Sequence, residues 1–402
     1  MLRFREFTPP ARLYLLAVFV SSLAGSIFHL ALNFYLETLK FDRRDIGIIN
    51  AAAPGALVVA GLLIGRVSDR LGRGRGLLLG ATLGLTAILG LSLSSTMTWL
   101  VAFAACRGIA EAMVGANSAP FMAEHSAPEH RVHLFAFQAA VMTATGLFGN
   151  VVGGHLPDWY SAWWGLAPKS PEAFRVTLLT GAGIYSLSLV PFAIIGLRRE
   201  TPPSRDTERL ETGPVGRLFF KLLLPHAIVG LGAGMTMPFL NLYVQGKFHI
   251  DVEHVGYLFG FSSVLTAAGM LVQPWVAHRF GKVAAIQLTQ AVSIPFLLVL
   301  GFCPVFWLVA VAMLIRNMLM NMASPIYSAF SMEIVPRERR ATFSVAAMMA
   351  WNSGWAISTA VSGVLQRQLG PETGFNIAFG AMAGLYVTSI VVFHFFFQRK
   401  RR

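Results

Sequence analysis

Charged side chains that could do chemistry stand inside long apolar stretches of this chain. Arg107 and Glu111 are four residues apart, so on a helix they share one face and can form an ion pair. A charge within an apolar span is costly, which makes each such residue a functional candidate. Either the pair only neutralises itself, or Glu111 binds a proton when Arg107 moves away. We therefore treat Arg107 and Glu111 as a candidate proton-coupling pair.

Arg316 stands in another apolar stretch and has no carboxylate within one helical turn along the sequence. Its partner must be a residue from elsewhere, a backbone carbonyl or a ligand. Arg107 and Arg316 facing one cavity would bind a carboxylate or phosphate by paired hydrogen bonds, which predicts an anionic substrate. In the alternative interpretation Glu111 neutralises Arg107, and Arg316 binds amide or backbone groups. The residues alone leave both open.

Other polar and aromatic residues in apolar stretches complete the candidate substrate site. Trp351 and Trp355 are spaced to share a helix face, where they could stack on an aromatic or cationic ligand or pack against lipid. The predicted substrate-binding residues are His29, Asn33, Arg107, Arg316, Asn317, Asn321, Trp351, Asn352 and Trp355.

Composition indicates that these residues are held by membrane helices. The 402 residues are 55% hydrophobic and 13% charged, whereas a soluble domain has about 25% charged residues. Apolar runs of about twenty residues, each long enough to span a bilayer, recur throughout the chain. We find no Walker loop, zinc-ligand spacing or nucleophile elbow, so we expect no enzyme activity, no metal and no cofactor. Cys106 and Cys303 are interpreted as small core residues rather than redox groups.

The apolar runs predict an all-α membrane protein of twelve transmembrane helices in two pseudo-symmetric six-helix bundles. The expected domains are 1–197 and 217–402, joined by a cytoplasmic linker at 198–216 that is rich in Pro, Gly and charge. The expected spans are 12–36, 45–64, 76–95, 99–122, 132–157, 174–197, 217–245, 252–277, 283–301, 304–331, 341–368 and 374–397.

The net charge of +13 lies in short loops rather than in one basic stripe, so we interpret it as a membrane-orientation signal and not as a nucleic-acid site. Lys and Arg concentrate on the side that holds both termini when the N-terminus is placed in the cytoplasm. We therefore expect a multi-pass protein of the cell (inner or plasma) membrane, monomeric, with both termini cytoplasmic and lipid headgroups as neighbours.

A short basic connector at 65–76 joins the second and third predicted spans. An apolar helix should end near Ile64 and the next should begin near Leu77, with glycines between them for a tight turn. Its residues Gly65, Asp69, Arg70, Gly72 and Arg73, followed by Arg75, resemble the loop signature of the major facilitator superfamily. Val67 replaces the usual Leu, and Gly74 replaces one of the usual basic pair.

That resemblance implies a secondary transporter that works by alternating access. It also implies a conformational latch formed by Gly65, Asp69, Arg70, Gly72 and Arg73, in which Asp69 lies near the start of the eleventh helix and closes the cytoplasmic side. We expect that helix to begin near Ala341. Arg107 falls where many proton-coupled antiporters of the family carry an arginine. Residues 149–154 resemble the family's exporter signature, with Asn150 in place of Pro.

The two halves of the chain are similar to each other. Asp69 to Arg73 aligns with His278 to Lys282 at an offset of 209 residues, and Arg107 aligns with Arg316 at the same offset. Parallel repeats of this kind hold substrate near the membrane midplane in transporters. The main prediction is proton-coupled export of a small organic solute. Alternatives are uptake or exchange of an organic anion through Arg107 and Arg316, lipid flipping, and a receptor that does not transport.

Overall fold

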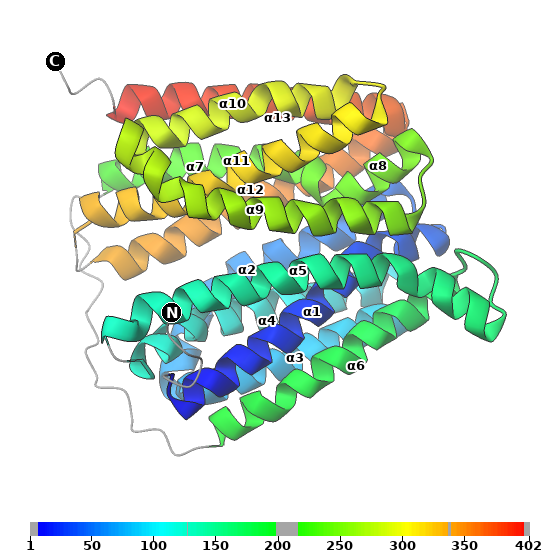
Figure 1. The fold of residues 1–402 in the computed structure, drawn as a ribbon, viewed down its shortest axis with the longest axis horizontal. Coiled ribbons are helices and arrows are strands. Elements are labelled where there is room, and N and C mark those ends of the chain that lie inside the picture. The colour runs from blue at the N-terminus through cyan, green and yellow to red at the C-terminus, as the bar shows by residue number, and fades with distance from the viewer. Residues whose placement is uncertain (1–6, 127, 198–215, 337–338, 398–402) are drawn as a thin grey trace. The chain divides into compact units, whose positions relative to one another are not determined.

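The computed structural model describes residues 7–126, 128–197, 216–336 and 339–397, without some side chains inside helices. Over these ranges the regular structure is entirely helical (Figure 1). The helices are α1 (Pro9–Thr38), α2 (Arg43–Leu71), α3 (Arg73–Leu93), α4 (Met97–Glu124), α5 (Pro128–Trp164), α6 (Pro171–Gly196), α7 (Gly216–Thr236), η2 (Met237–Phe239), α8 (Leu240–Phe248), α9 (Val252–Phe280), α10 (Lys282–Phe302), α11 (Phe306–Ile334), α12 (Arg340–Leu369) and α13 (Pro371–Phe397).

The twelve predicted spans are confirmed as helices, with α7, η2 and α8 together forming the seventh. Nine helical segments in the described ranges are long and apolar enough to cross a membrane, and α2, α5 and α12 complete the set. The expected linker at 198–216 lies almost wholly outside the described residues. The fifth span was expected to end at 157, whereas α5 continues through the aromatic stretch at 158–164 to Trp164.

Local sequence signals explain where several helices begin and break. Thr8 caps α1 by accepting a hydrogen bond from the backbone N–H of Ala11, and Ser170 caps α6 in the same way. Both caps precede a proline, whose fixed φ suits the first helical turn. Pro238 interrupts the seventh span, because a proline removes a backbone N–H from the ladder, and the chain passes through the short 3-10 turn η2 before α8.

A single glycine connects α2 to α3, which corrects the expected connector. α2 runs on to Leu71 rather than ending near Ile64, and α3 begins at Arg73 rather than near Leu77. Gly72 turns the chain with a φ of 86°, and Gly281 makes the same turn between α9 and α10 with a φ of 78°. Residues other than glycine disfavour this positive-φ conformation because they carry a Cβ atom. The hydropathy pattern showed where the apolar stretch ends, while the helices themselves continue through charged residues.

The internal repeat extends to helix boundaries and ion pairs. α2, α3 and α4 begin 209 residues before α9, α10 and α11, respectively. Arg73 of α3 pairs with Glu124 of α4, with 3.9 Å between Nε and Oε1. Lys282 of α10 pairs with Glu333 of α11 at the equivalent positions. Each half therefore ties the start of its third helix to the end of its fourth by the same charge arrangement.

The chain forms two compact units, which we describe separately. The first contains Met1–Asp42, Ala52–Arg205 and Ile250–Gly260, and the second contains Arg43–Ala51, Asp206–His249 and Phe261–Arg402. In the first unit α1 packs on α5 and α6, and α3 packs on α4 and α6. In the second, α7 packs on α12 and α13, and α10 packs on α11 and α13.

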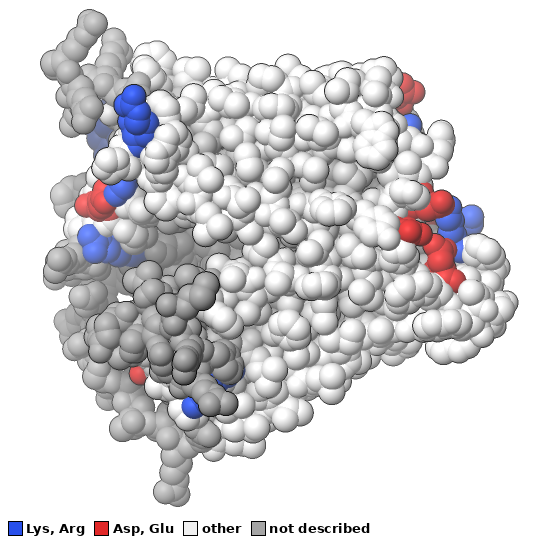
Figure 2. All heavy atoms as spheres, viewed as in Figure 1, with Lys and Arg blue, Asp and Glu red and all other residues white. Residues whose placement is uncertain are grey.

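The surface fits a lipid environment. On the face shown in Figure 2, described Lys, Arg, Asp and Glu side chains gather at the helix ends, and the band between the ends is free of them. Large apolar side chains are exposed along the helices, including Leu271 at 84% and Trp307 at 74%. Such patches are rare on soluble monomers and mark surfaces that another apolar phase covers. The chain is therefore a membrane protein.

Candidate functional site

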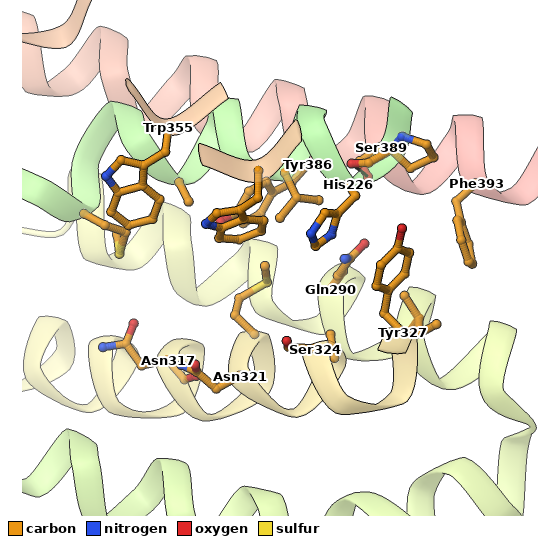
Figure 3. A pocket seen from close by; sticks show the side chains of 18 of the residues that line it. His226, Gln290, Asn317, Asn321, Ser324, Tyr327, Trp355, Tyr386, Ser389 and Phe393 are labelled. Atoms are coloured by element: carbon orange, nitrogen blue, oxygen red, sulfur yellow. Dashed lines mark hydrogen bonds between the residues drawn. The ribbon is translucent and has the colours of Figure 1, made fainter. Parts of the chain in front are cut away.

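The second unit contains a cavity of about 550 Å³ lined by residues of α7, η2, α10, α11, α12 and α13 (Figure 3). Six of the predicted substrate-binding residues line it, and they come from two helices. The six are Arg316, Asn317, Asn321, Trp351, Asn352 and Trp355. Residues that line the cavity and that we did not predict include His226, Gln290, Tyr327 and Tyr386.

Arg316 is the one charged residue among the described residues that line this cavity. Its side chain is only 4% exposed. Its guanidinium donates to Tyr386 Oη at 2.7 Å and to Asn317 Oδ1 at 3.0 Å. Its Nε–H is buried and makes no hydrogen bond with another described residue. Neutral groups thus hold the cation in place, and no described carboxylate balances its charge.

Three elements hold the Arg316 guanidinium in position. Tyr386 of α13 lies below it, with 5.8 Å between the guanidinium carbon and the ring centroid. The break in the seventh span brings Met237 Sδ to 3.0 Å from Nη1 of Arg316. Asn317 also donates to Ser262 Oγ at 2.9 Å, which fixes the amide oxygen that faces the arginine. The cation is therefore held in one orientation before any ligand arrives.

Aromatic rings form a second feature of the cavity. The ring of His226 on α7 stacks on Tyr327 of α11 at 4.6 Å between centroids and 2° between planes. Trp351 lies 5.1 Å from His226 on another side, and Trp355 lies 6.1 Å from Trp351. We refer to His226, Tyr327, Trp351 and Trp355 as the aromatic wall. Both tryptophans therefore line a cavity rather than only contacting lipid.

Carboxamides supply the remaining polar groups. Asn321 and Asn352 each donate one amide hydrogen to the backbone carbonyl one turn earlier, at 2.8 and 2.9 Å. An amide nitrogen carries two hydrogens, so each side chain can still donate to a ligand while held by its own helix. Gln290 of α10 lines the same cavity beside His226 (Figure 3).

The first unit has its own cavity, of about 490 Å³, which Arg107, Glu111 and His29 line. Arg107 Nε lies 3.5 Å from Glu111 Oε1, which gives the predicted ion pair. Arg107 Nη1 also lies 3.2 Å from Nε2 of His29. The Glu111 side chain is 46% exposed, so its carboxylate is open to the cavity. The two arginines of the repeat thus have different surroundings, because Arg107 has a counterion on its own helix.

Other predicted residues lie elsewhere. Asn33 follows His29 by one turn but is 5% exposed and lines neither of these cavities. Gly65, Asp69 and Arg70 belong to α2, and their side chains lie outside the described part of the chain. Gly72 forms the turn before α3, and Arg73 pairs with Glu124 of its own unit. α12 begins at Arg340, one residue before the expected start.

The fold and the lined cavities are those of a membrane transport protein, and comparisons with known proteins agree. The profile described as Major Facilitator Superfamily matches residues 14–359 and 222–402. The chain therefore belongs to the major facilitator superfamily and is a transporter of that family.

Solved structures share the fold at low sequence identity. The nucleoside transporter NupG, as a D323A mutant, superposes with a TM-score of 0.74 at 17% identity, covering 96% of this chain and 98% of that one. A bacterial homologue of the human lysosomal transporter Spinster, inward-facing and occupied, gives 0.74 at 16% identity and covers 98% of both chains. These likenesses show the fold alone.

Two curated relatives are also similar in sequence. An uncharacterised membrane protein of Saccharomyces cerevisiae is 22% identical in an alignment 316 residues long, which covers 69% of this chain and 70% of that protein. The methyl viologen resistance protein SmvA of Salmonella typhimurium is 35% identical over 113 residues, which is 27% of this chain and 22% of that protein.

Proposed function

We propose that this transporter carries a small organic anion, held in the cavity of the second unit by Arg316, in a cycle of alternating access. The observation that supports this proposal is the charge of that cavity. Arg316 is buried, retains an Nε–H without a described partner, and has no carboxylate among the described residues around it. An uncompensated buried cation is costly, and an anionic ligand would offset that cost. This proposal takes up the organic-anion alternative of the sequence analysis, with Arg316 as the anion-binding residue, in preference to the main prediction of proton-coupled export.

The proposal is tested by counterflow. Purified protein is reconstituted in liposomes loaded with one unlabelled organic anion at millimolar concentration, and uptake of a trace of the same labelled anion is followed without an imposed ion or pH gradient. A matched set of organic cations of similar size is the control. Exchange of anions and not of cations supports the proposal. Exchange restricted to cations contradicts it, and no exchange of any member of a broad panel favours the receptor alternative.

A second proposal is that Glu111 couples transport to protons. Its carboxylate is paired with Arg107 but open to the cavity of the first unit. Movement of Arg107 away from Glu111 would leave an unpaired carboxylate in an apolar span, which then favours the protonated form.

We also propose that the protein is inserted in the cell membrane with both termini in the cytoplasm.

Glu111→Gln tests the coupling. The glutamine cannot exchange a proton, so accumulation driven by a pH gradient should fall to the level seen without a gradient, while counterflow persists. The measurement is labelled uptake into proteoliposomes with and without the gradient, and Glu172→Gln, in the first turn of α6 and outside both cavities, is the control. Gradient-driven uptake that survives in Glu111→Gln would exclude this carboxylate as the coupling group.

A specific observation favours a second candidate function, export of an organic cation. The Glu111 carboxylate opens into the first cavity, and the partial relative SmvA is described as a methyl viologen resistance protein. A cation would compete with Arg107 and protons for Glu111. The counterflow panel separates this function from anion transport, because a cation exporter exchanges the cationic members and keeps doing so when Arg316 is replaced.

The latch residues remain a proposal that follows from the loop signature. An aspartate near a helix start is favoured by the free N–H groups and the helix dipole, and α12 starts at Arg340. Asp69→Asn should shift the protein away from the outward-facing state by roughly 2- to 30-fold, the range of a helix-dipole interaction. Accessibility of an engineered cytoplasmic-side cysteine measures the shift. Unchanged accessibility and transport, at normal expression, argue against the latch.

A further inference from the structure

We infer that the solute bound by Arg316 carries a flat ring close to its anionic group, which makes it an aromatic or heteroaromatic carboxylate. This inference rests on the proposed function, and it follows from a separate feature of the same cavity, the aromatic wall. Four rings from three helices line one cavity together with a single cation.

Ring stacking and a hydrogen bond hold the aromatic wall in place. Tyr327 is 9% exposed and donates its hydroxyl hydrogen to the backbone carbonyl of Leu222 at 3.0 Å. The His226 ring lies parallel on Tyr327, so one face of the imidazole is already covered. Trp351 and Trp355 occupy successive turns of α12, with 31° between their ring planes. A flat ligand would therefore meet preformed surfaces and would cost the protein little side-chain freedom.

The rings of the aromatic wall are not all fully buried. His226, Trp351 and Trp355 are each partly exposed, and each lines the cavity. Aromatic rings in a closed core would instead be covered by neighbours on every side, as Phe343 and Phe379 are in this unit. Rings that stay open to a cavity offer faces and edges on which another ring can stack with an offset or meet edge to face.

The polar groups around the wall fit a ring with heteroatoms. Gln290, Asn321 and Asn352 come from α10, α11 and α12, and each presents a neutral amide to the cavity. A carboxamide can donate a hydrogen bond to a ring nitrogen or accept one from a ring N–H. These residues would therefore form hydrogen bonds with the edge of a heterocycle while the aromatic wall contacts its face. Arg316 would bind the carboxylate through paired hydrogen bonds.

The charge of the cavity decides against the other ligand that aromatic rings bind well. Organic cations are attracted to aromatic faces. In this cavity, however, the described lining residues include Arg316 and no carboxylate, so a cation would meet an uncompensated like charge. The combination of an aromatic wall and a lone arginine therefore selects an anion with an aromatic body.

A matched pair of probes tests the inference on the purified full-length protein. The probes are 2-naphthoate and decalin-2-carboxylate, which share charge and approximate size but differ in aromaticity. Dissociation constants are measured by thermal stabilisation over a range of probe concentrations. We expect naphthoate to bind roughly 2- to 12-fold more tightly, the range expected for one aromatic contact. Trp351→Leu should remove that preference, and Trp351→Phe should retain most of it.

Trp163→Leu is the control variant for Trp351→Leu, because Trp163 is exposed on α5 of the other unit. It should keep the preference for naphthoate. Equal binding of both probes, each weakened by loss of Arg316, would overturn the ring inference and leave anion transport standing. A preference for naphthoate that is unchanged in both Trp351→Leu and Trp355→Leu would also overturn it, since the selectivity would then arise away from the tryptophans of the wall. Failure of both probes to bind would overturn the proposed anion site and the ring inference together.

Discussion

Arg316→Met should reduce binding and exchange of organic anions by roughly 10- to 150-fold, the equivalent of about 1.5–3 kcal/mol for hydrogen bonds to a charged group. The same change should not lower the melting temperature of the ligand-free protein. Methionine fills similar space, and replacing an uncompensated buried charge by an apolar side chain is often neutral or stabilising. Counterflow with labelled anion measures the first effect, and thermal unfolding without ligand measures the second.

Arg175→Met is a matched control for this substitution. Arg175 also bonds to a tyrosine, with 3.2 Å between its Nε and Tyr35 Oη, but it lines neither of the two polar cavities. The Arg175→Met substitution should therefore leave anion exchange intact. If Arg316→Met exchanges anions as fast as the unmodified protein, Arg316 is a structural residue and the proposed site is wrong.

Met320→Glu should weaken anion binding without removing Arg316. Met320 lines the cavity one turn after Arg316, and it aligns with Glu111 through the 209-residue repeat. A carboxylate there would copy the Arg107–Glu111 arrangement and neutralise the cation. The dissociation constant for the anion should rise roughly tenfold or more, because the introduced carboxylate competes for the same guanidinium. Equilibrium binding of 2-naphthoate to purified protein measures the change.

Met320→Gln is the control for size and polarity, because glutamine matches the shape of glutamate and carries no charge. It should bind the anion nearly as well as the unmodified protein. Equal losses in the two variants would mean that the position tolerates no polar side chain, and the charge argument would lose its support. Unchanged binding in Met320→Glu would show that the anion is held by another residue.

The spans could be predicted from the sequence because each is an apolar run bounded by charge. The end of α2 could not, because helix continues past Ile64 through residues that lie beyond the apolar stretch. Hydropathy indicates where the apolar stretch ends, whereas a helix ends where the backbone leaves the helical conformation. At Gly72 that point is a positive φ, which only the structure places at a single residue.

Candidate residues on one helix were predictable, and their partners on other helices were not. Arg316, Asn317 and Asn321 lie on α11 at spacings that the sequence reveals. Tyr386 accepts a hydrogen bond from Arg316, and Tyr327 donates one to the carbonyl of Leu222, each through its hydroxyl group. Both tyrosines stand in spans whose other residues look like apolar core. His226 offered a signal, since a histidine in an apolar span is uncommon, but its neighbours Tyr327 and Trp351 lie about 100 or more residues away.

Asn33 shows the limit of spacing arguments. It lies four residues after His29 on α1, so the two share a helix face. His29 lines the cavity of the first unit, whereas Asn33 is buried and does not line it. Periodicity predicts which way a side chain points, but the depth at which a cavity ends depends on packing between helices.

The most direct test of the central claim compares charge on the ligand with charge at residue 316. Binding of 2-naphthoate and of its neutral analogue 2-naphthamide is measured to the unmodified protein and to Arg316→Met. We predict that the unmodified protein prefers the carboxylate by roughly tenfold or more and that Arg316→Met shows no preference. An equal preference for the carboxylate in both proteins would contradict the assignment of Arg316 as the anion site.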